Sequence, residues 1–168
     1  VAQTQKYAQM CDEIGIKEGG HILEIGCGWG GFAEYAAGQR GAKVKGLTIS
    51  QEQHDFAVAR IERAGLSQQV EIVMQDYRDE SAKYDGIASI EMFEAVGQKY
   101  WDTYFDKIYH SLNNEGKVCL QIITINDASF NHYADNVDFI QKYIFPGGML
   151  PSKSILLKLF KKHKLELY

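Results

Sequence analysis

The stretch Ile22-Leu23-Glu24-Ile25-Gly26-Cys27-Gly28-Trp29-Gly30-Gly31 decides the fold of this chain. The mostly apolar run over residues 21–25 predicts a short strand. The glycines after it predict a tight turn, because glycine adopts backbone conformations that other residues avoid. Residues 32–39 then favour a helix, so the stretch is a strand, a turn and a helix. The bland alternative is a glycine turn that joins the two elements and binds nothing.

Strand and helix patterns alternate along the rest of the chain. Ser50 is the expected N-cap of a helix that runs to Ala64, and Gln53 completes a capping box. Strands separated by helices of this length imply parallel crossovers, and therefore a Rossmann-like, doubly wound α/β sheet that is mostly parallel. Ligands of such sheets bind at the carboxyl ends of the strands. Besides the first strand and helix, we expect helices at 3–14, 51–64 and 99–112, and strands at 42–49, 70–74, 86–90 and 118–125.

Length and composition bound what the chain can be. Its 168 residues suit a single domain over residues 1–168. Hydrophobic residues make up 45% of the chain and charged residues 24%, which excludes a disordered segment. The apolar runs are too short to span a bilayer. Three cysteines at unrelated spacings suit a reducing compartment, and no His, Cys and carboxylate residues have metal-ligand spacing, so we expect no metal.

The net charge of −4 conceals an asymmetry. Residues 1–138 hold 21 acidic against 12 basic residues, a net charge of −9, whereas residues 139–168 hold six lysines and one glutamate. An acidic body argues against a nucleic-acid partner. The commonplace interpretation of the basic tail is an amphipathic helix with solvated lysines. The more specific interpretation is that the lysines form a face that binds anionic lipid headgroups.

The glycine loop fits two nucleotide patterns. Gly26, Gly28 and Gly31 fit the dinucleotide fingerprint, but residues 46–50 hold no acid for a ribose, and Trp29 is bulky where a pyrophosphate would enter. Glu24 with glycines at 26, 28 and 30 resembles the loop of S-adenosylmethionine-dependent methyltransferases. Glu24 suits the cationic groups of S-adenosylmethionine, although it could instead cap turn amides. Cys27 is explained as a small loop residue.

Five blocks of sequence extend this resemblance. They are residues 22–33, 46–53, 75–79, 89–97 and 143–151. In this order they resemble the cyclopropane-fatty-acyl-phospholipid synthase family, with its mycolic-acid cyclopropane synthase relatives. The resemblance implies a sheet of the class I methyltransferase type. Because the chain starts at Val1 and ends as a further strand begins at 165–168, we expect a cofactor-binding core truncated at both ends.

The resemblance implies a set of residues that bind S-adenosylmethionine. For the methionine portion these are Gly26, Cys27, Gly28 and Ile90, for the ribose Thr48, Ile49 and Gln53, and for the adenine Asp76 and Tyr77. Three alternatives stay open: Gln53 as a capping partner only, Asp76 as a turn former, and Tyr77 as core packing.

In this family the alkene of an unsaturated acyl chain attacks the S-methyl carbon, and the resulting cation loses a proton as the ring closes. The resemblance implies that Glu94 and Gln121 hold a bicarbonate that acts as the base, with a backbone contact at Ile123. Glu94 could instead be a charge at a helix N-terminus, and Glu91 could touch the methionine ammonium. Ala95 and Gln121 stand where family members have histidine, and the family's upstream cysteine and far C-terminal tyrosine are missing here.

Plain packing is the alternative for the aromatic and histidine residues. Phe93, Tyr143 and Phe145 fall in the matched blocks, but core packing explains each one better than contact with a cation. The five histidines, at 21, 54, 110, 132 and 163, match nothing catalytic and are expected at the surface or at strand ends.

The sequence therefore predicts a cyclopropane synthase that acts on unsaturated phospholipid acyl chains. We expect it to be cytoplasmic and peripheral to the inner face of the membrane. The alternatives are a lipid C-methyltransferase of the same fold and a non-catalytic core that binds S-adenosylmethionine.

Overall fold

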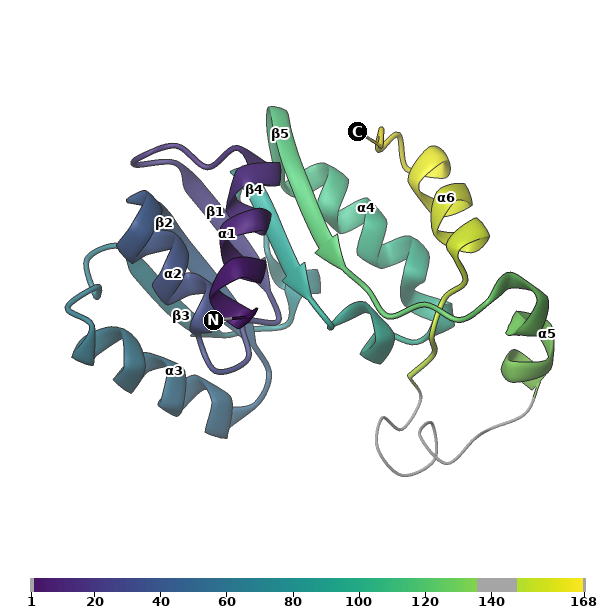
Figure 1. The fold of residues 1–168 in the computed structure, drawn as a ribbon, viewed down its shortest axis with the longest axis horizontal. Coiled ribbons are helices and arrows are strands. Elements are labelled where there is room, and N and C mark those ends of the chain that lie inside the picture. The colour runs from purple at the N-terminus through teal and green to yellow at the C-terminus, as the bar shows by residue number, and fades with distance from the viewer. Residues whose placement is uncertain (1, 136–147, 168) are drawn as a thin grey trace. The chain divides into compact units, whose positions relative to one another are not determined.

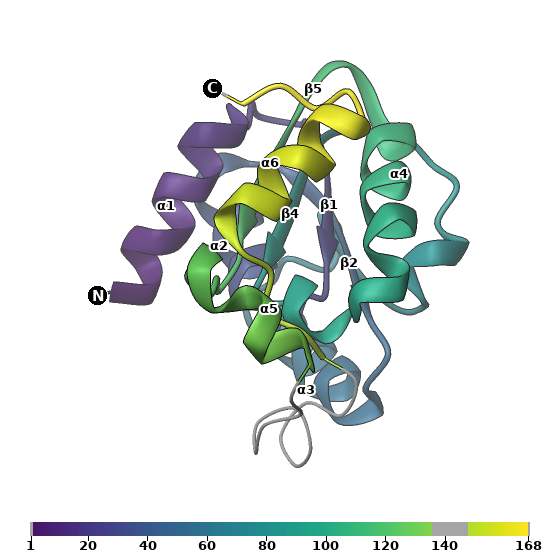
Figure 2. The same ribbon diagram turned by 90° about the vertical axis from the view of Figure 1, so that its right-hand side faces the viewer.

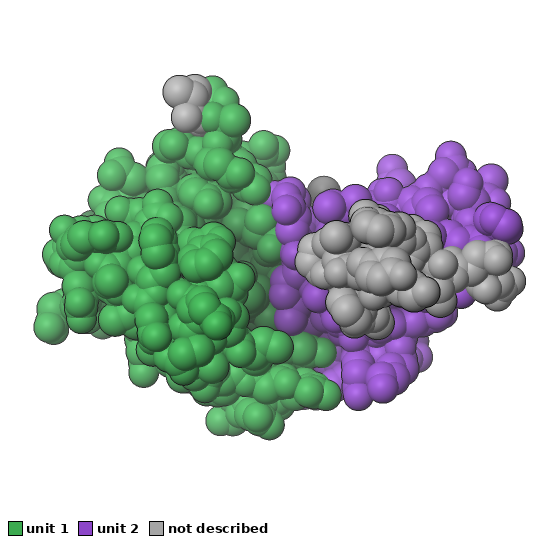
Figure 3. Space-filling view, turned by 90° about the horizontal axis from the view of Figure 1, so that it is seen from below, with its two compact units in different colours: residues 1–90, 111–120 green, residues 91–110, 121–168 purple. Residues whose placement is uncertain are grey.

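The computed structural model describes residues 2–135 and 148–167. The chain divides into two compact units, coloured separately in Figure 3. Unit 1 consists of residues 1–90 and 111–120, and unit 2 of residues 91–110 and 121–168.

Unit 1 is built on a five-stranded sheet in the order β3-β2-β1-β4-β5. Strand β1 pairs in parallel with β2 and with β4, and β2 pairs in parallel with β3. This is the doubly wound topology that the alternating pattern predicts. The strands are β1 (His21–Ile25), β2 (Lys43–Thr48), β3 (Val70–Met74), β4 (Tyr84–Ile90) and β5 (Leu112–Gln121). The last residue of β5, Gln121, is assigned to unit 2.

Three helices, α1 (Ala2–Ile14), α2 (Gly31–Arg40) and α3 (Gln51–Arg63), cover one face of this sheet (Figures 1 and 2). They share one hydrophobic core with the strand residues that face them. Phe32 and Ala33 of α2 are essentially inaccessible to solvent. The other members of that core are Met10, Cys11, Ile14, Ile22, Ala36, Ala37, Ala42, Val44, Ile61, Val70 and Ala88.

Local sequence explains where α2 and α3 begin and end. Ser50 caps α3, because its side chain accepts a hydrogen bond from the backbone N–H of Gln53. Gly41 ends α2 in the left-handed conformation (φ 67°), and its N–H bonds to carbonyls of the last turn. The predicted boundaries of these helices therefore agree with the structure within one residue.

Unit 2 contains the helices α4 (Trp101–Ser111), α5 (Asp127–Asp135) and α6 (Lys153–Lys162). The last residue of α4, Ser111, is assigned to unit 1. Phe93 is buried and lies 5.1–5.4 Å, between ring centroids, from Trp101, Tyr104 and Phe105. Phe105 also meets Phe160 of α6, edge to face, at 5.2 Å. The core-packing interpretation of Phe93 is thus confirmed, whereas Tyr143 and Phe145 lie outside the described residues.

Three sequence predictions differ from the structure. The fifth strand covers 112–121 rather than 118–125, because Lys83 Nζ and Asp85 Oδ1 tie Leu112 and Asn113 to the start of β4. Residues 165–167 form no strand. Helix α5 has no counterpart among the predicted helices; its start is held where Asp127 Oδ1 accepts from the backbone N–H of Ser154 at 3.1 Å.

Within the part of the chain that the structure describes, no helix combines the length and the apolar character that crossing a bilayer requires.

Candidate functional site

The glycine loop follows β1 at the carboxyl end of the sheet. Gly26, Gly28 and Gly30 all have positive φ (77°, 53° and 76°), so the turn depends on glycine. A Cβ on Gly30 would lie 3.0 Å from that of Ala57, whereas one on Gly28 would meet nothing within 4 Å. The loop is therefore packed on its α3 side and has open space beside Gly28. Backbone can approach a ligand there without obstruction.

Glu24 is a buried carboxylate directly beneath this loop, with 2% of its surface exposed. It accepts a hydrogen bond from the backbone N–H of Ala33, which lies in the first turn of α2 and not in the glycine turn. Its Oε2 is buried and has no hydrogen-bond partner among the described residues. Burial raises the pKa of Glu24 well above its usual value. A cationic group beside Oε2 would relieve this cost, so capping leaves one oxygen for a ligand.

Cys27 lies in the same loop and is also buried. Its backbone N–H donates to the carbonyl of Leu47 at 2.8 Å, which joins the loop to the end of β2. Burial, with a smaller contribution from Glu24, raises the pKa of the Cys27 thiol to about 12. A thiol with this pKa is protonated at neutral pH and is not a nucleophile.

Thr48 and Gln53 form a polar pair at the end of β2. The Thr48 hydroxyl donates to Oε1 of Gln53 at 2.9 Å, and the same hydroxyl oxygen accepts the Ser50 N–H at 3.2 Å. This fixes the Gln53 amide with its nitrogen, and its two N–H donors, turned away from Thr48. The predicted capping box is therefore only half formed: Ser50 caps the Gln53 N–H, but the Ser50 N–H bonds to Thr48 and not to the Gln53 side chain. Ile49, between them, is 78% exposed.

The segment after β3 lies beside Thr48, because the backbone N–H of Gln75 donates to the Thr48 carbonyl at 3.0 Å. Asp76 caps a short 3-10 helix, η1 (Tyr77–Asp79), through the backbone N–H of Arg78, as the turn-former interpretation predicts. The Arg78 guanidinium also bonds both Asp76 oxygens, at 2.9 and 2.6 Å. This arginine holds the pKa of Asp76 below its usual value. Tyr77 is half-buried.

Unit 1 therefore brings the ends of β1, β2 and β3 together, as parallel pairing requires. Ile90 ends β4 and packs against the hydrophobic core while remaining half-buried. These side chains suit the polar groups of S-adenosylmethionine. The buried oxygen of Glu24 suits its ammonium, the amide donors of Gln53 suit its ribose hydroxyls, and the Asp76 carboxylate suits its adenine amine. The residues present fit this cofactor.

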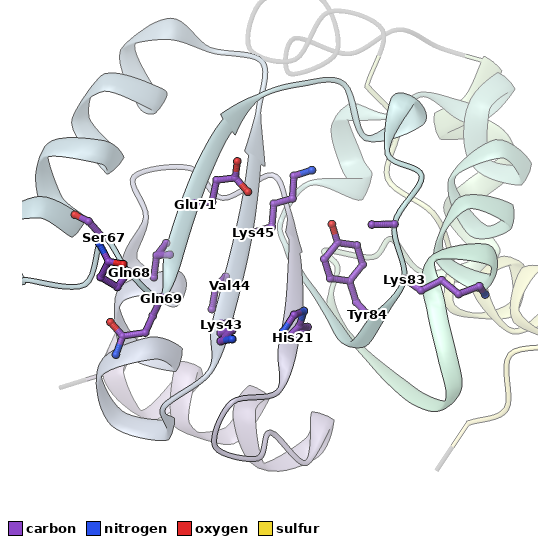
Figure 4. A pocket seen from close by; sticks show the side chains of 12 residues that line it. His21, Lys43, Val44, Lys45, Ser67, Gln68, Gln69, Glu71, Lys83 and Tyr84 are labelled. Atoms are coloured by element: carbon purple, nitrogen blue, oxygen red, sulfur yellow. The ribbon is translucent and has the colours of Figure 1, made fainter.

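A cavity of about 390 Å³ lies at the opposite end of the sheet (Figure 4). His21, Lys43, Val70 and Tyr84, which begin the first four strands, are among its lining residues. The lining includes none of the predicted cofactor residues. This cavity is separate from the candidate cofactor site.

In unit 2, Glu94 is buried with 6% of its surface exposed. Its Oε1 accepts a hydrogen bond from the backbone N–H of Ile123, and its backbone carbonyl accepts from Met149 N–H at 2.8 Å. Its Oε2 is buried without a partner among the described residues. The Ile123 N–H is thus already used by Glu94, and the carboxylate keeps one free acceptor.

The side chain of Gln121 is hydrogen-bonded to that of Glu91. Its Nε2 donates to Glu91 Oε1 at 2.6 Å, while the Glu91 N–H donates to the Gln121 carbonyl at 2.9 Å. Glu91 adopts the left-handed conformation, with a φ of 51°. This conformation costs a non-glycine residue roughly 1–2 kcal/mol. Gln121 Oε1 is buried and has no partner among the described residues.

One histidine differs from its prediction. His163 is buried rather than at the surface, because its ring nitrogens each lie 2.8 Å from a carboxylate oxygen, of Asp106 and of Asp102. Lys162 Nζ also donates to Asp102 at 2.8 Å. These contacts tie α6 to α4. Among the described residues, no group of His, Cys and carboxylate side chains could hold a metal ion.

A known protein family accounts for this chain along its entire length. A family model described as mycolic acid cyclopropane synthetase matches residues 1–168. The chain belongs to the mycolic acid cyclopropane synthetase family. The family that the five sequence blocks resemble is therefore confirmed.

Individual relatives of this synthetase family sharpen the comparison. Tuberculostearic acid methyltransferase UfaA1 of Mycobacterium tuberculosis (strain ATCC 25618 / H37Rv) is 40% identical over 162 residues, which cover 96% of this chain and 38% of that protein. Cyclopropane-fatty-acyl-phospholipid synthase of Escherichia coli (strain K12) is 44% identical over 152 residues, which cover 90% and 37%. The chain thus spans less than half the length of these relatives.

Solved structures agree on the fold of the synthetase family member described here. Mycolic acid cyclopropane synthase CmaA1, complexed with SAH and CTAB, matches with a TM-score of 0.86 at 24% identity, over 96% of this chain and 60% of that one. The Rossmann-like fold of the class I methyltransferase type is confirmed.

Some partners of the candidate residues are not predictable from the sequence. Arg78 follows Asp76 by two residues, and this spacing was a local signal of their pairing. Glu91 and Gln121 are 30 residues apart, so no local signal connected them.

Proposed function

We propose that this chain is an S-adenosylmethionine-binding domain over residues 1–168 that transfers a methylene carbon to the double bond of unsaturated phospholipid acyl chains and so forms cyclopropane fatty acids. The observation that carries the proposal is the buried Oε2 of Glu94, which has no hydrogen-bond partner among the described residues, in a chain of this family. Similarity to an enzyme named cyclopropane-fatty-acyl-phospholipid synthase supports the substrate.

The candidate residues of unit 1 bind the cofactor in this proposal. Glu24 receives the ammonium, Thr48 and Gln53 hold the ribose, and Asp76 with Tyr77 holds the adenine. Gly26, Cys27, Gly28, Ile49 and Ile90 provide close contact. When bound, S-adenosylmethionine supplies an electrophilic methyl carbon. The structure of a family member complexed with SAH supports this choice of cofactor.

Glu94 serves the step after transfer. An acyl chain that has accepted the methyl carbon carries a positive charge next to it. Loss of one proton from that methyl group leaves the electron pair that closes the three-membered ring. Glu94 Oε2 is a buried acceptor that can take up this proton directly, or would take the hydroxyl proton of a bicarbonate whose unprotonated oxygen accepts the methyl proton.

The residues present fit bicarbonate only in part. Bicarbonate has one hydroxyl proton, so only one of the two buried acceptors, Glu94 Oε2 or Gln121 Oε1, can bond it, while the Ile123 N–H is occupied by Glu94. We propose bicarbonate as the intermediary base, bound through its hydroxyl.

The basic tail supports a membrane partner on the cytoplasmic side, with peripheral attachment. Leu157 of α6 is 43% exposed, and Lys153, Lys158 and Lys161 around it are exposed as well. An apolar side chain among lysines suits a surface of anionic lipid headgroups. Lys162 is instead paired with Asp102.

The experiment is incubation of the chain with unsaturated phospholipid vesicles and S-adenosylmethionine labelled in its methyl group, followed by mass analysis of the recovered acyl chains. A labelled cyclopropane ring is the expected product. A labelled methyl branch instead favours the second candidate, a lipid C-methyltransferase, which the likeness to tuberculostearic acid methyltransferase UfaA1 supports. Cofactor binding without transfer indicates a non-catalytic core and overturns the proposal.

A further inference from the structure

Glu80 is a buried carboxylate of unit 1, with 3% of its surface exposed. Its Oε1 accepts hydrogen bonds from the backbone N–H groups of Ser81 and Ala82, each at 2.9 Å. Its Oε2 accepts from Gln75 Nε2 at 3.2 Å and lies 2.7 Å from Lys45 Nζ. Burial raises the pKa of this carboxyl group, but the bonds that it accepts, above all the one from Lys45, bring that pKa below its usual value. Glu80 is therefore ionised at neutral pH, and the bonds around it offset the cost of burying its charge.

The partners of Glu80 belong to different strands of the sheet. Lys45 lies in β2, and Gln75 follows the last residue of β3. The Tyr84 hydroxyl, at the start of β4, also bonds the Glu80 carboxylate. Strand β1 separates β2 from β4, and the side chains of Lys45 and Tyr84 come from its two sides (Figure 4). Glu80 therefore joins the segment after β3 to the sheet itself and not only to its neighbours in the loop.

Gln75 and Glu80 enclose the segment over residues 76–79. At its start, the Gln75 backbone N–H donates to the Thr48 carbonyl at 3.0 Å while the Gln75 side chain donates to Glu80. At its end, the Glu80 N–H donates to the Tyr77 carbonyl at 3.2 Å and closes η1. The segment, which carries Asp76 and Tyr77, is thus tied to the sheet at both ends. A binding element that is already held in one conformation loses less entropy when it binds.

The position of Asp76 matters because its hydrogen-bonding capacity is nearly used. Arg78 donates three hydrogen bonds to it, from its backbone N–H, its Nε and its Nη2. A carboxylate offers about four acceptor sites, so these bonds leave room for one more, on Oδ2. An exocyclic amine can fill that site, whereas the carboxylate repels a carbonyl oxygen in the same place. One acceptor distinguishes the two groups only if it is held in a fixed position.

We propose that Glu80 is a positioning residue that holds Asp76 and Tyr77 where they meet the adenine of S-adenosylmethionine. Through them it determines the preference of the site for adenine over a purine base with a carbonyl oxygen at C6. This inference rests on the proposed function, in which Asp76 and Tyr77 hold the adenine. Glu80 acts on the base through the bonds that fix both ends of the segment over residues 76–79.

The test measures base preference by calorimetric titration at neutral pH. The two ligands are S-adenosylhomocysteine and S-inosylhomocysteine, which differ only in the purine base. The ratio of their dissociation constants is compared between the wild type, Glu80→Gln and Gln75→Met. Glu62→Gln, which changes an exposed glutamate on α3, is the matched control.

The two variants loosen the segment in different ways. Glu80→Gln keeps the volume of the side chain but places an amide opposite Lys45, so the ion pair is lost. Gln75→Met removes the bond between the side chains at positions 75 and 80, and leaves that ion pair and the backbone bond to Thr48 in place. Thermal melts show whether each variant folds, and Gln75→Met decides the test if Glu80→Gln does not.

We expect the wild type and Glu62→Gln to bind the adenine compound about tenfold more tightly than the inosine compound, a difference typical of one charge-assisted hydrogen bond. In Glu80→Gln and Gln75→Met the ratio should fall to about threefold or less, through weaker binding of the adenine compound. A loss of stability alone would leave the ratio unchanged, because it affects the binding of both ligands alike.

An unchanged ratio in Glu80→Gln, or in Gln75→Met where Glu80→Gln does not fold, overturns the inference. Equal affinities for the two compounds in the wild type overturn it too. Binding of neither compound by the wild type overturns the proposed function, on which the inference rests.

Discussion

The hydroxyl of Thr48 donates to Oε1 of Gln53 while accepting the N–H of Ser50, and so it sets the direction of the Gln53 amide. Replacing Thr48 by valine keeps the shape and removes both bonds. We expect the affinity for S-adenosylmethionine to fall about fivefold, equivalent to about 1 kcal/mol, because the amide donors are no longer aimed. Calorimetric titration measures the change.

Ser50→Ala is the matched control for that variant. It removes the cap of α3 and leaves the pair formed by Thr48 and Gln53 intact. Losing such a cap costs about 1 kcal/mol in the free energy of unfolding. Its affinity for the cofactor should equal that of the wild type well below the melting temperature. A loss as large as that of Thr48→Val would mean that the amide direction does not matter.

Glu24→Gln should raise the free energy of unfolding and lower the affinity for S-adenosylmethionine. Burial raises the pKa of Glu24, so between pH 4.5 and that raised pKa the native state holds a proton that the unfolded state has released. The free energy of unfolding of the wild type therefore falls as the pH rises through this interval. The glutamine variant lacks this fall and should be more stable by about 1–3 kcal/mol above it.

The same variant should bind S-adenosylmethionine at least tenfold more weakly, because a charge-assisted bond to the ammonium is lost. Urea unfolding at several pH values and calorimetry measure the two effects. A variant that matches the wild type in both would refute the buried-carboxylate account of Glu24.

Asp102→Asn tests the contact between α4 and α6. Lys162, and then His163, hold the pKa of Asp102 below its usual value of 3.8. The stabilisation is thus present above pH 3.8 and lost as the pH falls through the lowered native pKa. The pair with Lys162 is exposed. We therefore expect the variant to be less stable by up to about 1 kcal/mol at neutral pH. Thermal melts should converge in strong acid, and the exposed Asp79→Asn should melt like the wild type at neutral pH.

Exposed lysines of α6 should govern vesicle binding. The double variant Lys158→Gln, Lys161→Gln removes two charges, each worth about 1 kcal/mol near an anionic surface, so partitioning onto anionic vesicles should fall about thirtyfold. The control replaces Lys17 and Lys43 of unit 1, which are also exposed. Sedimentation with vesicles gives both values, and equal losses would point to net charge rather than to α6.

Features encoded by neighbouring residues were predictable from the sequence. The apolar run before the glycines predicts β1, and Ser50 with Gln53 predicts the start of α3, because both signals lie within a few residues. Candidate positions at strand ends also follow from parallel pairing, which brings the carboxyl ends of β1, β2 and β3 to one edge.

Contacts between distant residues were not predictable. His163 is buried by Asp106 and Asp102, which lie 57 and 61 residues away. The direction of the Gln121 amide depends on Glu91, and the free oxygen of Glu94 depends on Ile123 taking the other one. Sequence patterns name such residues but cannot say which of their atoms remain available.

The most direct test of the central claim measures the formation of labelled cyclopropane acyl chains on unsaturated phospholipid vesicles by the wild type and by Glu94→Gln. The glutamine keeps an oxygen for the Ile123 N–H but cannot take up a proton. The account predicts ring formation at least 100-fold slower in the variant, with its affinity for S-adenosylmethionine within twofold of the wild type. Equal ring formation by the two proteins, or none by the wild type, would contradict it.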